Sequence, residues 1–415
     1  MSTLRPCAVV RGAQDLASAV ACALTDAGYA VVMAEGPLPA VTRRGQAFAD
    51  AAFDGSATFL DKTCRRIDDI RAWRDSGSPD IAYSTAPLDL ILAALTPELL
   101  VDARMRKRAI PEDQRELAPL VIGLGPNFDA GGNCHLAVET GWGETLGSVV
   151  EKGPTRALAG EPKPVNGWSR DRYVYAPVAG VFQTRLDIGD TVTEGQVIAR
   201  IGDTPIAAPK TGVVRGLIRD GVPLDVKQKC VEIVPAGTNV RMLAERPRRA
   251  AEGVLAAIRL RHGLLPVGRK AIHGVLANAA EGLLPPFART LGFDAASLPG
   301  HFAPLVDILM AERAPELRER PARWLAHAIA CSAFGQRHTW QDLRLSGRRE
   351  VSAMFALHFP AFAARNTPEL NLKWRRFLFH ELGLRLGVPA LMPPGCSACD
   401  GFAECFGDQP EGAKA

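Results

Sequence analysis

The first part of the chain alternates short apolar runs with amphipathic stretches. Residues 7–11 and 29–34 read as buried strands, and the stretch 17–27 between them has the spacing of a helix. Strand-like runs recur at 120–125 and 135–140. Because strands that alternate with helices form parallel sheets, residues 1–165 are predicted to form a Rossmann-like parallel α/β domain.

The turn between the first strand and the helix carries candidate chemistry. A strand, a glycine-bearing turn, a helix, a strand and an acidic residue follow one another, as in dinucleotide-binding βαβ units. Gln14 stands where that motif has its middle glycine, so a plain βαβ turn is the alternative. Loops at the carboxyl ends of the strands would line any crevice. The candidate cofactor-binding residues are Gly12, Asp15, Glu35, Arg104 and Gly125.

An internal repeat marks the middle of the chain. Residues 176–181 (Ala-Pro-x-x-Gly-Val) recur at 208–213, and alternating apolar and polar residues with turn glycines lie between them. Two equal sets of short strands predict an all-β barrel-sandwich hybrid over 166–240, similar to biotinyl and lipoyl domains. The predicted hairpin tip, 202–205, has no lysine to carry a swinging arm. We therefore interpret this module as a rigid structural or docking domain.

After about residue 241 the strand pattern stops and helical periodicity takes over. An all-α domain with a Cys-rich tail is predicted over 241–415. Its expected helices cover 250–260, 267–281, 301–312, 320–335, 348–357 and 368–386.

Composition narrows the class of protein. With 415 residues, 47% hydrophobic and 23% charged residues, the chain is an ordinary multidomain globular protein. The net charge of +4, without a basic stripe interleaved with aromatics, does not indicate nucleic-acid binding. No apolar run reaches the length of a membrane span, and the N-terminus does not read as a signal peptide. Nine cysteines without secreted-type spacing predict a reducing cytoplasm.

Three cysteines cluster near the end of the chain. The spacing C-x2-C-x5-C relates Cys396, Cys399 and Cys405, which lie in a polar tail. Cysteines of packed cores are instead scattered singly among apolar neighbours. Thiolates select zinc, Cu(I) or iron–sulfur clusters. The spacing alone favours a structural zinc site slightly over a cluster, and a disulfide comes third.

From about residue 264 to 407 the chain resembles the nitrogen-fixation family NifQ, proposed molybdenum donors for the iron–molybdenum cofactor of nitrogenase. The resemblance rests on His338/Trp340/Asp342/Leu343, Phe359-Pro360, Arg365-Asn366, Lys373-Trp374, Pro394-x-Cys396-x-x-Cys399 and Cys405-Phe406-Gly407. That family's pattern is C-x4-C-x2-C-x5-C, and Leu391 stands here at its first cysteine. The resemblance implies metal ligands Cys396, Cys399 and Cys405, with His338 as the best further candidate because it opens the motif.

Most of residues 8–235 resembles the YqeB family, accessory proteins associated with selenium-dependent molybdenum hydroxylases. The matching signatures are Val10-Arg11-Gly12-Ala13-x-Asp15-Leu16-Ala17, Arg43-Arg44 with Phe48, Val101-Asp-Ala-Arg104-Met105, Val121-Ile-Gly-Leu-Gly125-Pro126 and Val138-Glu139-Thr140. Arg43, Arg44 and Arg104 are candidates for binding a nucleotide phosphate or molybdate. A solvated surface position is the alternative for each.

Three hypotheses follow. In the first, the protein carries an iron–sulfur cluster, holds molybdenum at its open corner and donates it to a cofactor-assembly scaffold without being a turnover enzyme. In the second, it is a nucleotide-binding accessory protein for maturation of a molybdenum hydroxylase, with structural zinc in the tail. In the third, it is an assembly scaffold whose cysteine motif has decayed.

Overall fold

The computed structural model describes residues 5–77, 81–107, 109–157, 162–292, 295–388, 391–394, 396 and 402–406. The chain divides into two compact units, Met1–Thr25 with Tyr29–Ala257 and Asp26–Gly28 with Ile258–Ala415. The predicted division into three domains, 1–165, 166–240 and 241–415, stays a prediction. Among the described helices, none combines the length and the apolar character that crossing a lipid bilayer requires.

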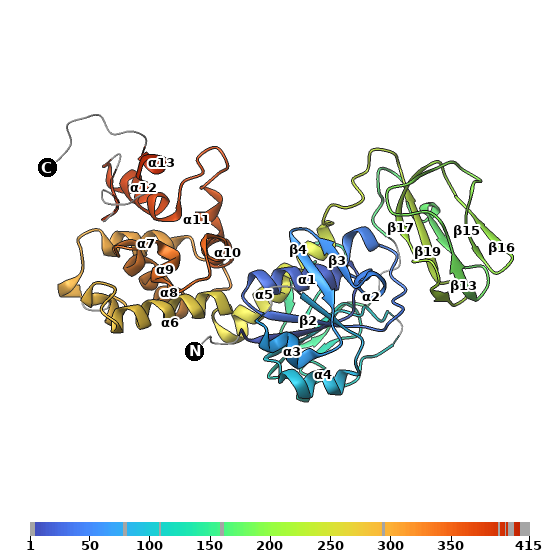
Figure 1. Cartoon of the computed structure of the whole chain (residues 1–415), viewed down its shortest axis with the longest axis horizontal. Coiled ribbons are helices and arrows are strands. Elements are labelled where there is room, and N and C mark those ends of the chain that lie inside the picture. Colours follow the sequence, from blue (N-terminus) through green and yellow to red (C-terminus); the bar gives the residue numbers. More distant parts are fainter. Residues whose placement is uncertain are drawn as a thin grey trace. The chain divides into compact units, whose positions relative to one another are not determined.

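The first unit is built on a nine-stranded sheet in the order β10-β9-β7-β6-β1-β2-β5-β4-β3 (Figure 1). Most of its strand pairs are parallel, which confirms the parallel α/β sheet that the sequence predicted. The residues of β1, β6 and β7 are almost all buried, which explains their continuous apolar runs. The strands are β1 Cys7–Arg11, β2 Ala30–Ala34, β3 Ser56–Phe59, β4 Lys62–Arg66, β5 Ile81–Ser84, β6 Leu99–Asp102, β7 Leu120–Leu124, β9 Leu136–Val138 and β10 Val149–Val150. The helices are α1 Asp15–Asp26, α2 Ala51–Asp54, α3 Ile70–Asp75 and α4 Leu88–Leu95. β8 Asp129–Ala130 and β11 Gly153–Pro154 form a separate pair.

The strand order reverses at β1. The chain passes from β1 to β2 and β5 on one side and returns to β6 on the other side of β1, in parallel. In open α/β sheets, ligands bind outside the carboxyl ends of the strands near such a switch point. The loops that leave β1, β2, β6, β7 and β9 all emerge at this edge.

A second set of strands, in the same unit, forms two four-stranded sheets, β12-β19-β17-β14 and β16-β15-β13-β18. Each copy of the repeat places its glycine, Gly180 or Gly212, at the first residue of a strand. The predicted tip at 202–205 lies in the β15–β16 hairpin. The lipoyl-like barrel stays a prediction. The strands are β12 Tyr173–Tyr175, β13 Gly180–Gln183, β14 Thr191–Val192, β15 Val197–Ile201, β16 Thr204–Ala207, β17 Gly212–Leu217, β18 Pro223–Leu224 and β19 Lys229–Val234.

The second unit is helical, as predicted, and is coloured from gold to red in Figure 1. Its helices, beginning with one that the unit boundary divides, are α5 Glu245–His262, α6 Pro266–Ala280, α7 Phe302–Ala311, α8 Glu319–Ala333, α9 Thr339–Asp342, α10 Arg348–His358, α11 Pro360–Ala364, α12 Trp374–Leu386 and α13 Phe402–Phe406. Eight phenylalanines, each less than one-tenth exposed, contribute to its core: Phe287, Phe302, Phe334, Phe355, Phe359, Phe362, Phe377 and Phe379. The helix expected over 368–386 begins only at Trp374, because residues before it form a loop.

That loop is held by one side chain. Asn366 accepts a hydrogen bond from the amide of Leu372 (2.9 Å) and donates one to its carbonyl oxygen (2.9 Å). Asn371 has a positive φ of 38°, which interrupts a regular helix. The loop therefore delivers Lys373 and Trp374 to the start of α12 in a fixed position.

The short helix α9 packs on α6 through a glycine. A methyl group at Gly274 would overlap the carbonyl oxygen of Leu343, directly after α9. Asn278, one turn later, donates hydrogen bonds to the carbonyl oxygens of Gln341 (2.8 Å) and Asp342 (2.9 Å). The close approach of α6 thus sets the position of α9.

Gly274→Ala should destabilise the helical unit by about 1–3 kcal/mol, because the added methyl must push α9 away from α6. Chemical denaturation of the full chain measures this loss. Gly300→Ala is the matched control, since a methyl there meets nothing within 4 Å. Equal stability of the two variants would contradict the proposed packing.

Candidate functional site

A pocket of about 740 Å³ in the helical unit gathers half of the residues on which the NifQ resemblance rests. We call it the cysteine pocket. The described residues that line it include Arg337, His338, Trp340, Arg348, Asn366, Lys373, Trp374, Arg375, Arg376, Cys396, Cys405 and Phe406. Segments up to 69 positions apart in the sequence therefore meet at one site.

The start of α9 supplies one wall of the cysteine pocket. The amide of His338 donates a hydrogen bond to Oε1 of Gln341 (3.0 Å), which fixes the first turn. The imidazole of His338 is exposed and lies nearly parallel to the indole of Trp340, with 6.5 Å between ring centroids. His338 thus presents its ring at the pocket, where the sequence placed a candidate ligand.

Helix α12 supplies the opposite wall. The indole of Trp374 stacks on Phe355 at 4.2 Å and donates a hydrogen bond to Oγ of Ser352 (2.8 Å). The Trp374 side chain is therefore a packing anchor that orients the first turn of α12. Lys373, Arg375 and Arg376 flank it and line the pocket.

A buried carboxylate joins the two walls. Asp342, at the end of α9, is fully buried and accepts hydrogen bonds from Nε of Arg337 (3.0 Å) and Nη2 of Arg375 (3.3 Å). Arg375 also donates to the carbonyl oxygens of Gly335 (3.0 Å) and Ser332 (2.9 Å). Burial raises the pKa of Asp342, whereas the two guanidinium groups act in the opposite direction.

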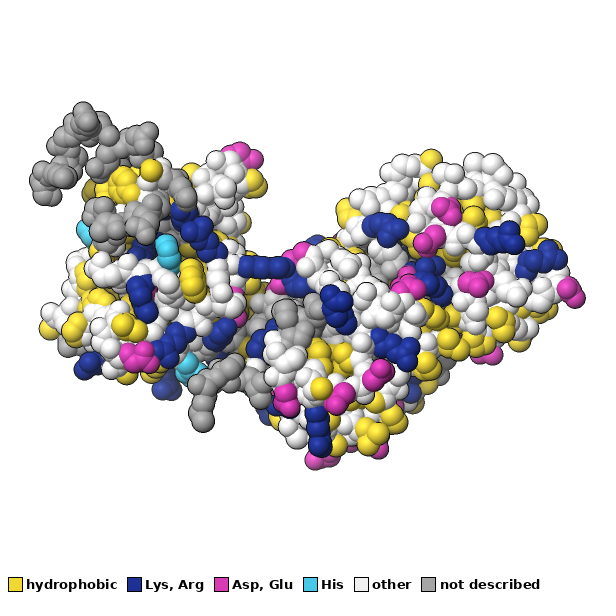
Figure 2. Space-filling model, viewed as in Figure 1, with side chains coloured by type: hydrophobic (Ala, Val, Ile, Leu, Met, Phe, Trp, Pro, Cys, Tyr) yellow, Lys and Arg dark blue, Asp and Glu magenta, His cyan; other side chains and the backbone are white. Residues whose placement is uncertain are grey.

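The cysteine pocket is strongly electropositive. Its described lining contains Arg337, Arg348, Lys373, Arg375 and Arg376, and no carboxylate among the placed residues. Figure 2 shows a histidine beside a group of lysine and arginine side chains on the visible face of the helical unit, at the left. Such a surface favours anionic ligands.

Two of the three predicted sulfur ligands lie in this pocket. Cys396 and Cys405 are both half-buried and line it. Cys405 belongs to α13, which approaches α12 through Phe406, since the Arg376 guanidinium lies 4.6 Å from that ring. Cys399 lies outside the described residues. Within those residues, no three His, Cys, Asp or Glu side chains form a group able to hold a metal ion.

Leu391 replaces the first cysteine of the family pattern. Its side chain is partly buried and packs against the helical core, close to Gly383 of α12. This position is thus used for packing.

Two other histidines of the helical unit, His358 and His380, have packing roles. His358 is fully buried, where Nε2 accepts a hydrogen bond from the amide of Leu265 (3.3 Å) and Nδ1 lies 3.0 Å from the carbonyl oxygen of Met354. Burial lowers the pKa of His358 to about 3, so it stays neutral. His380 stacks on Phe377.

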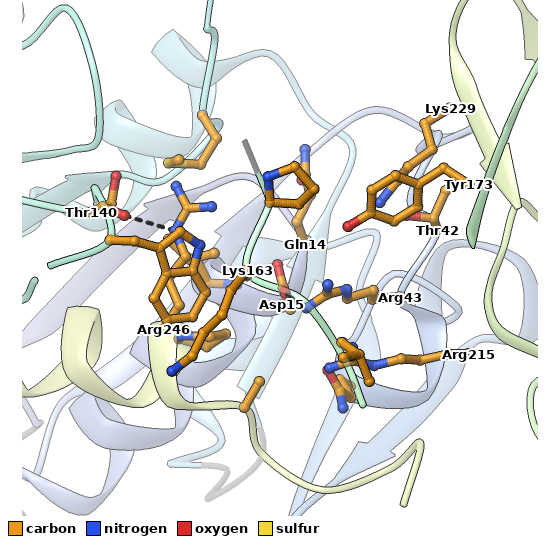
Figure 3. Close-up of a pocket in the computed structure, with 18 of the residues that line it drawn as sticks. Gln14, Asp15, Thr42, Arg43, Thr140, Lys163, Tyr173, Arg215, Lys229 and Arg246 are labelled. Carbon is orange, nitrogen blue, oxygen red and sulfur yellow. Dashed lines mark hydrogen bonds and ion pairs between the residues drawn. The ribbon is translucent and has the colours of Figure 1, made fainter. Parts of the chain in front are cut away.

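The predicted cofactor-binding residues of the first unit do not all meet. Asp15 lines a second pocket of about 1250 Å³, which we call the cationic pocket, between the loops after the parallel strands and the strands β12, β17 and β19 (Figure 3). Gly125 lies behind its wall, with a positive φ of 92° and close contact to Met105 and Thr140, which both line the pocket.

Gly12, Glu35 and Arg104 are not part of that lining. Gly12 has a φ of 110°, and a Cβ there would lie 3.2 Å from the carbonyl oxygen of Ala103, so this glycine allows two backbones to approach. The carboxylate of Glu35 accepts a hydrogen bond from the amide of Gly36 (2.8 Å). Arg104 pairs with Asp102 (2.5 Å).

The arginines that the sequence singled out have separate environments. Arg43 lines the cationic pocket and pairs with Asp15 (3.4 Å). Arg44 is buried and pairs with Asp50 (2.8 Å), so it is structural. Sequence reasoning missed Arg215, Lys229 and Arg246, which also line the pocket.

A sequence signal for the missed residues did exist. Glu232 lies between the apolar residues Val231 and Ile233 of strand β19 and is fully buried. A buried carboxylate requires cationic partners, and these come from neighbouring strands and a distant loop. The signal predicts that partners exist, but not which residues they are.

Comparisons with known proteins agree with the two resemblances. The family model described as NifQ matches residues 274–407. The NifQ protein of Rhodobacter capsulatus is 31% identical over 151 residues, which cover 32% of this chain and 83% of the relative. NifQ of Azotobacter vinelandii is 31% identical over 84 residues, which cover 20% of this chain and 42% of the relative.

The other part of the chain matches a protein named uncharacterized protein YqeB, from Escherichia coli K12. The identity is 37% over 274 residues, 65% of this chain and 50% of the relative, so the chain spans about half the length of that relative. Among solved structures, the apo structure of the ectoine utilization protein EutE (DoeB) from Ruegeria pomeroyi has a TM-score of 0.15 at 21% identity, covering 20% of this chain and 28% of that chain. A score this low carries no structural argument.

Native alkylation should distinguish pocket thiols from core thiols. In the metal-free protein, iodoacetamide should modify Cys396 and Cys405 more than about tenfold faster than Cys134, Cys230 and Cys331, because burial raises the pKa of each of the last three to about 12 and thiolates are the reactive form. Peptide mass spectrometry over a time course measures the rates. In guanidinium chloride all five should react alike, and equal rates in the native protein would contradict the assignment.

Proposed function

Because the chain belongs to the NifQ family, we propose that its cysteine pocket holds molybdenum within a thiolate-bound iron–sulfur centre and donates it during nitrogenase cofactor assembly. One observation carries this proposal. The pocket brings two of the predicted cysteines, His338 and five cations together, without a carboxylate among its described lining residues.

The donor set fits such a group. Thiolates are soft ligands that select iron–sulfur clusters, zinc or Cu(I) over magnesium and calcium. Cys396 and Cys405 line the pocket, and we assign Cys399, between them in the sequence, as the third thiolate. Three thiolates hold three corners of a cubane cluster and leave the fourth without a protein sulfur. His338 is the nearest candidate from α9 for that position.

The charges fit the cargo as well. Molybdate and thiolate-ligated clusters are anionic, and a carboxylate in the wall would repel them. Arg337 and Arg375 keep their positions because Asp342 pairs with both from behind the wall. The pocket thus combines soft ligands with a fixed positive field, which suits retention of an anionic metal centre.

A site of this kind serves a carrier. We propose a metal donor that acts on cofactor-assembly scaffold proteins in a reducing cytoplasm, with molybdate as the source of the metal, and not a turnover enzyme. For the first unit we propose a Rossmann-like sheet with a lipoyl-like module, supported by the switch in strand order at β1 and by the strand-starting glycines of the repeat.

Anaerobic purification should yield protein that contains iron, sulfide and molybdenum. Cys396→Ala and Cys405→Ala should each lower the iron and molybdenum content by roughly half or more, because each removes a thiolate ligand. Elemental analysis, sulfide assay and electron paramagnetic resonance measure the change.

Cys331→Ala provides the matched control, since this thiol lies in the helical core and should leave the metal content unchanged. Stoichiometric zinc without sulfide would overturn the proposal in favour of a structural zinc site. Full metal retention in both pocket variants would show that these two cysteines are not ligands of the metal.

Substitution of two neighbouring arginines of α10 tests whether the positive charge of the cysteine pocket contributes to molybdate binding. Arg348 lines the cysteine pocket and Arg349 does not. Arg348→Gln should weaken molybdate binding about two- to five-fold, the effect of one exposed charge, whereas Arg349→Gln should leave it unchanged. Calorimetric titration at low ionic strength measures both. Equal effects would show that only net charge matters.

A further inference from the structure

The cationic pocket carries far more positive charge than its own carboxylates neutralise. Nine lysine and arginine side chains line it against three carboxylates, those of Asp15, Glu139 and Glu245. Even with the buried Glu232 counted, the excess is five positive charges.

One buried carboxylate forms ion pairs with four of these cations. Glu232 lies within ion-pair distance of Arg172 (3.1 Å), Arg43 (3.3 Å), Arg215 (3.4 Å) and Lys229 (3.7 Å). Concentrating four cations on a single buried carboxylate costs free energy through mutual repulsion. An anion from outside would offset that cost.

The cations differ in how many of their N–H groups already have hydrogen-bond partners. Arg172 is fully buried and donates to the carbonyl oxygens of Trp168 and Ser169 as well as to Glu232, so it is structural. Arg215 is largely buried, and its Nε finds no hydrogen-bond partner within the part of the chain that the structure describes.

The remaining carboxylates of the lining are engaged locally. The carboxylate of Glu139 accepts hydrogen bonds from the backbone amides of Thr140, Gly141 and Arg156, each at 2.8 Å, and Glu245 pairs with Lys163 (2.6 Å). Arg215 and Lys229 share Glu232 with other cations, and Arg246 donates through Nε to the carbonyl oxygen of Thr140 (2.8 Å), so each of the three keeps further N–H groups for a ligand. Figure 3 shows Arg215 and Lys229 on one side of the pocket and Arg246 on the other, with Asp15 between them.

The volume of the cationic pocket and the aromatic residues in its lining indicate what the ligand contains besides its anionic group. A volume of about 1250 Å³ exceeds that of typical small-molecule sites, about 300–1,000 Å³, so one tetrahedral oxyanion would leave most of it empty. Trp142 and Tyr175 line the same pocket and are 38% and 41% exposed. Lys163 lies 4.9 Å from the centroid of the Trp142 ring, and the aromatic surface left exposed beside this cationic site suits a planar ring that carries phosphate groups.

We propose that the cationic pocket binds a nucleotide with at least two phosphate groups, its phosphates on Arg215, Lys229 and Arg246 and its base against Tyr175 or Trp142. Guanidinium and ammonium groups are the side chains that recognise phosphate in proteins. The site lies at the carboxyl-end loops of a parallel sheet, beside its switch point, where α/β proteins place such ligands. It uses side chains of β17, β19 and α5 in place of a glycine cradle at residues 12–17.

Calorimetric titration of the full chain tests the proposal with the four ribonucleoside triphosphates, the dinucleotide NAD, AMP, pyrophosphate and molybdate. At least one nucleotide with two or more phosphates should bind, and AMP should bind more than about tenfold more weakly. No binding by any nucleotide overturns the proposal. Pyrophosphate that binds as tightly as the best nucleotide, or molybdate that displaces that nucleotide at equal concentration, overturns the assignment of the aromatic wall.

Lys229→Met should weaken nucleotide binding about tenfold or more, because it removes a charge-assisted contact. The control is Arg200→Gln, which removes an exposed charge from β15 outside the pocket and should leave binding unchanged. Burial, with Arg43 and Lys107 nearby, lowers the pKa of Lys229 to about 8. The charged lysine is therefore unfavourable in the folded protein at pH 7, and Lys229→Met should not lower the melting temperature.

A large loss of thermal stability in Lys229→Met would indicate that the lysine has a structural role instead. Arg246→Met then tests the site from its other wall.

Proton linkage provides a second readout. The groups that face Lys229 are Glu232, Arg43, Asp15, Lys107 and the ring of Tyr173. A bound phosphate favours charged Lys229 and so raises its pKa above 8. Binding should therefore take up protons near pH 8.5 and weaken as the pH rises further. Lys229→Met should abolish this proton uptake, and its persistence in the variant would remove Lys229 from the site.

Discussion

Each pocket depends on a single buried carboxylate that holds several cations close together. Asp342 pairs with Arg337 and Arg375 behind the cysteine pocket, and Glu232 pairs with four cations behind the cationic pocket. Cations in contact repel one another, and a buried carboxylate without partners is costly, so neither component is stable alone. The two together produce a wall of fixed positive charge whose shape is set by the fold.

The elements that could be predicted are those whose signals are local. The strands β1, β6 and β7 are continuous apolar runs because they are buried, and the C-terminal helices have clear periodicity. The spacing of the cysteines and the family resemblance at His338 also marked a candidate site, and the described members of that set line one pocket. The start of α12 was missed because Asn366 holds the preceding loop through a contact that periodicity does not report.

The cationic pocket could not be predicted residue by residue. Its wall combines a loop after β2 with strands that follow more than a hundred residues later, so the pairing of Arg43 with Glu232 spans 189 positions. Gly12 illustrates another limit, because the lack of a side chain at this candidate cofactor-binding residue allows β1 to approach Ala103. A conformational requirement for glycine is visible in a sequence, but the group that comes close is not.

Leu391 has a consequence for how metal would leave a carrier of the proposed kind. Because its side chain is committed to the helical core near Gly383, the polypeptide offers no sulfur at that place. In such a carrier, His338 or an exchangeable group would fill the last coordination position. Where an exchangeable group fills it, an acceptor protein would substitute its own ligand there before any cysteine dissociates, and the handover would begin by association.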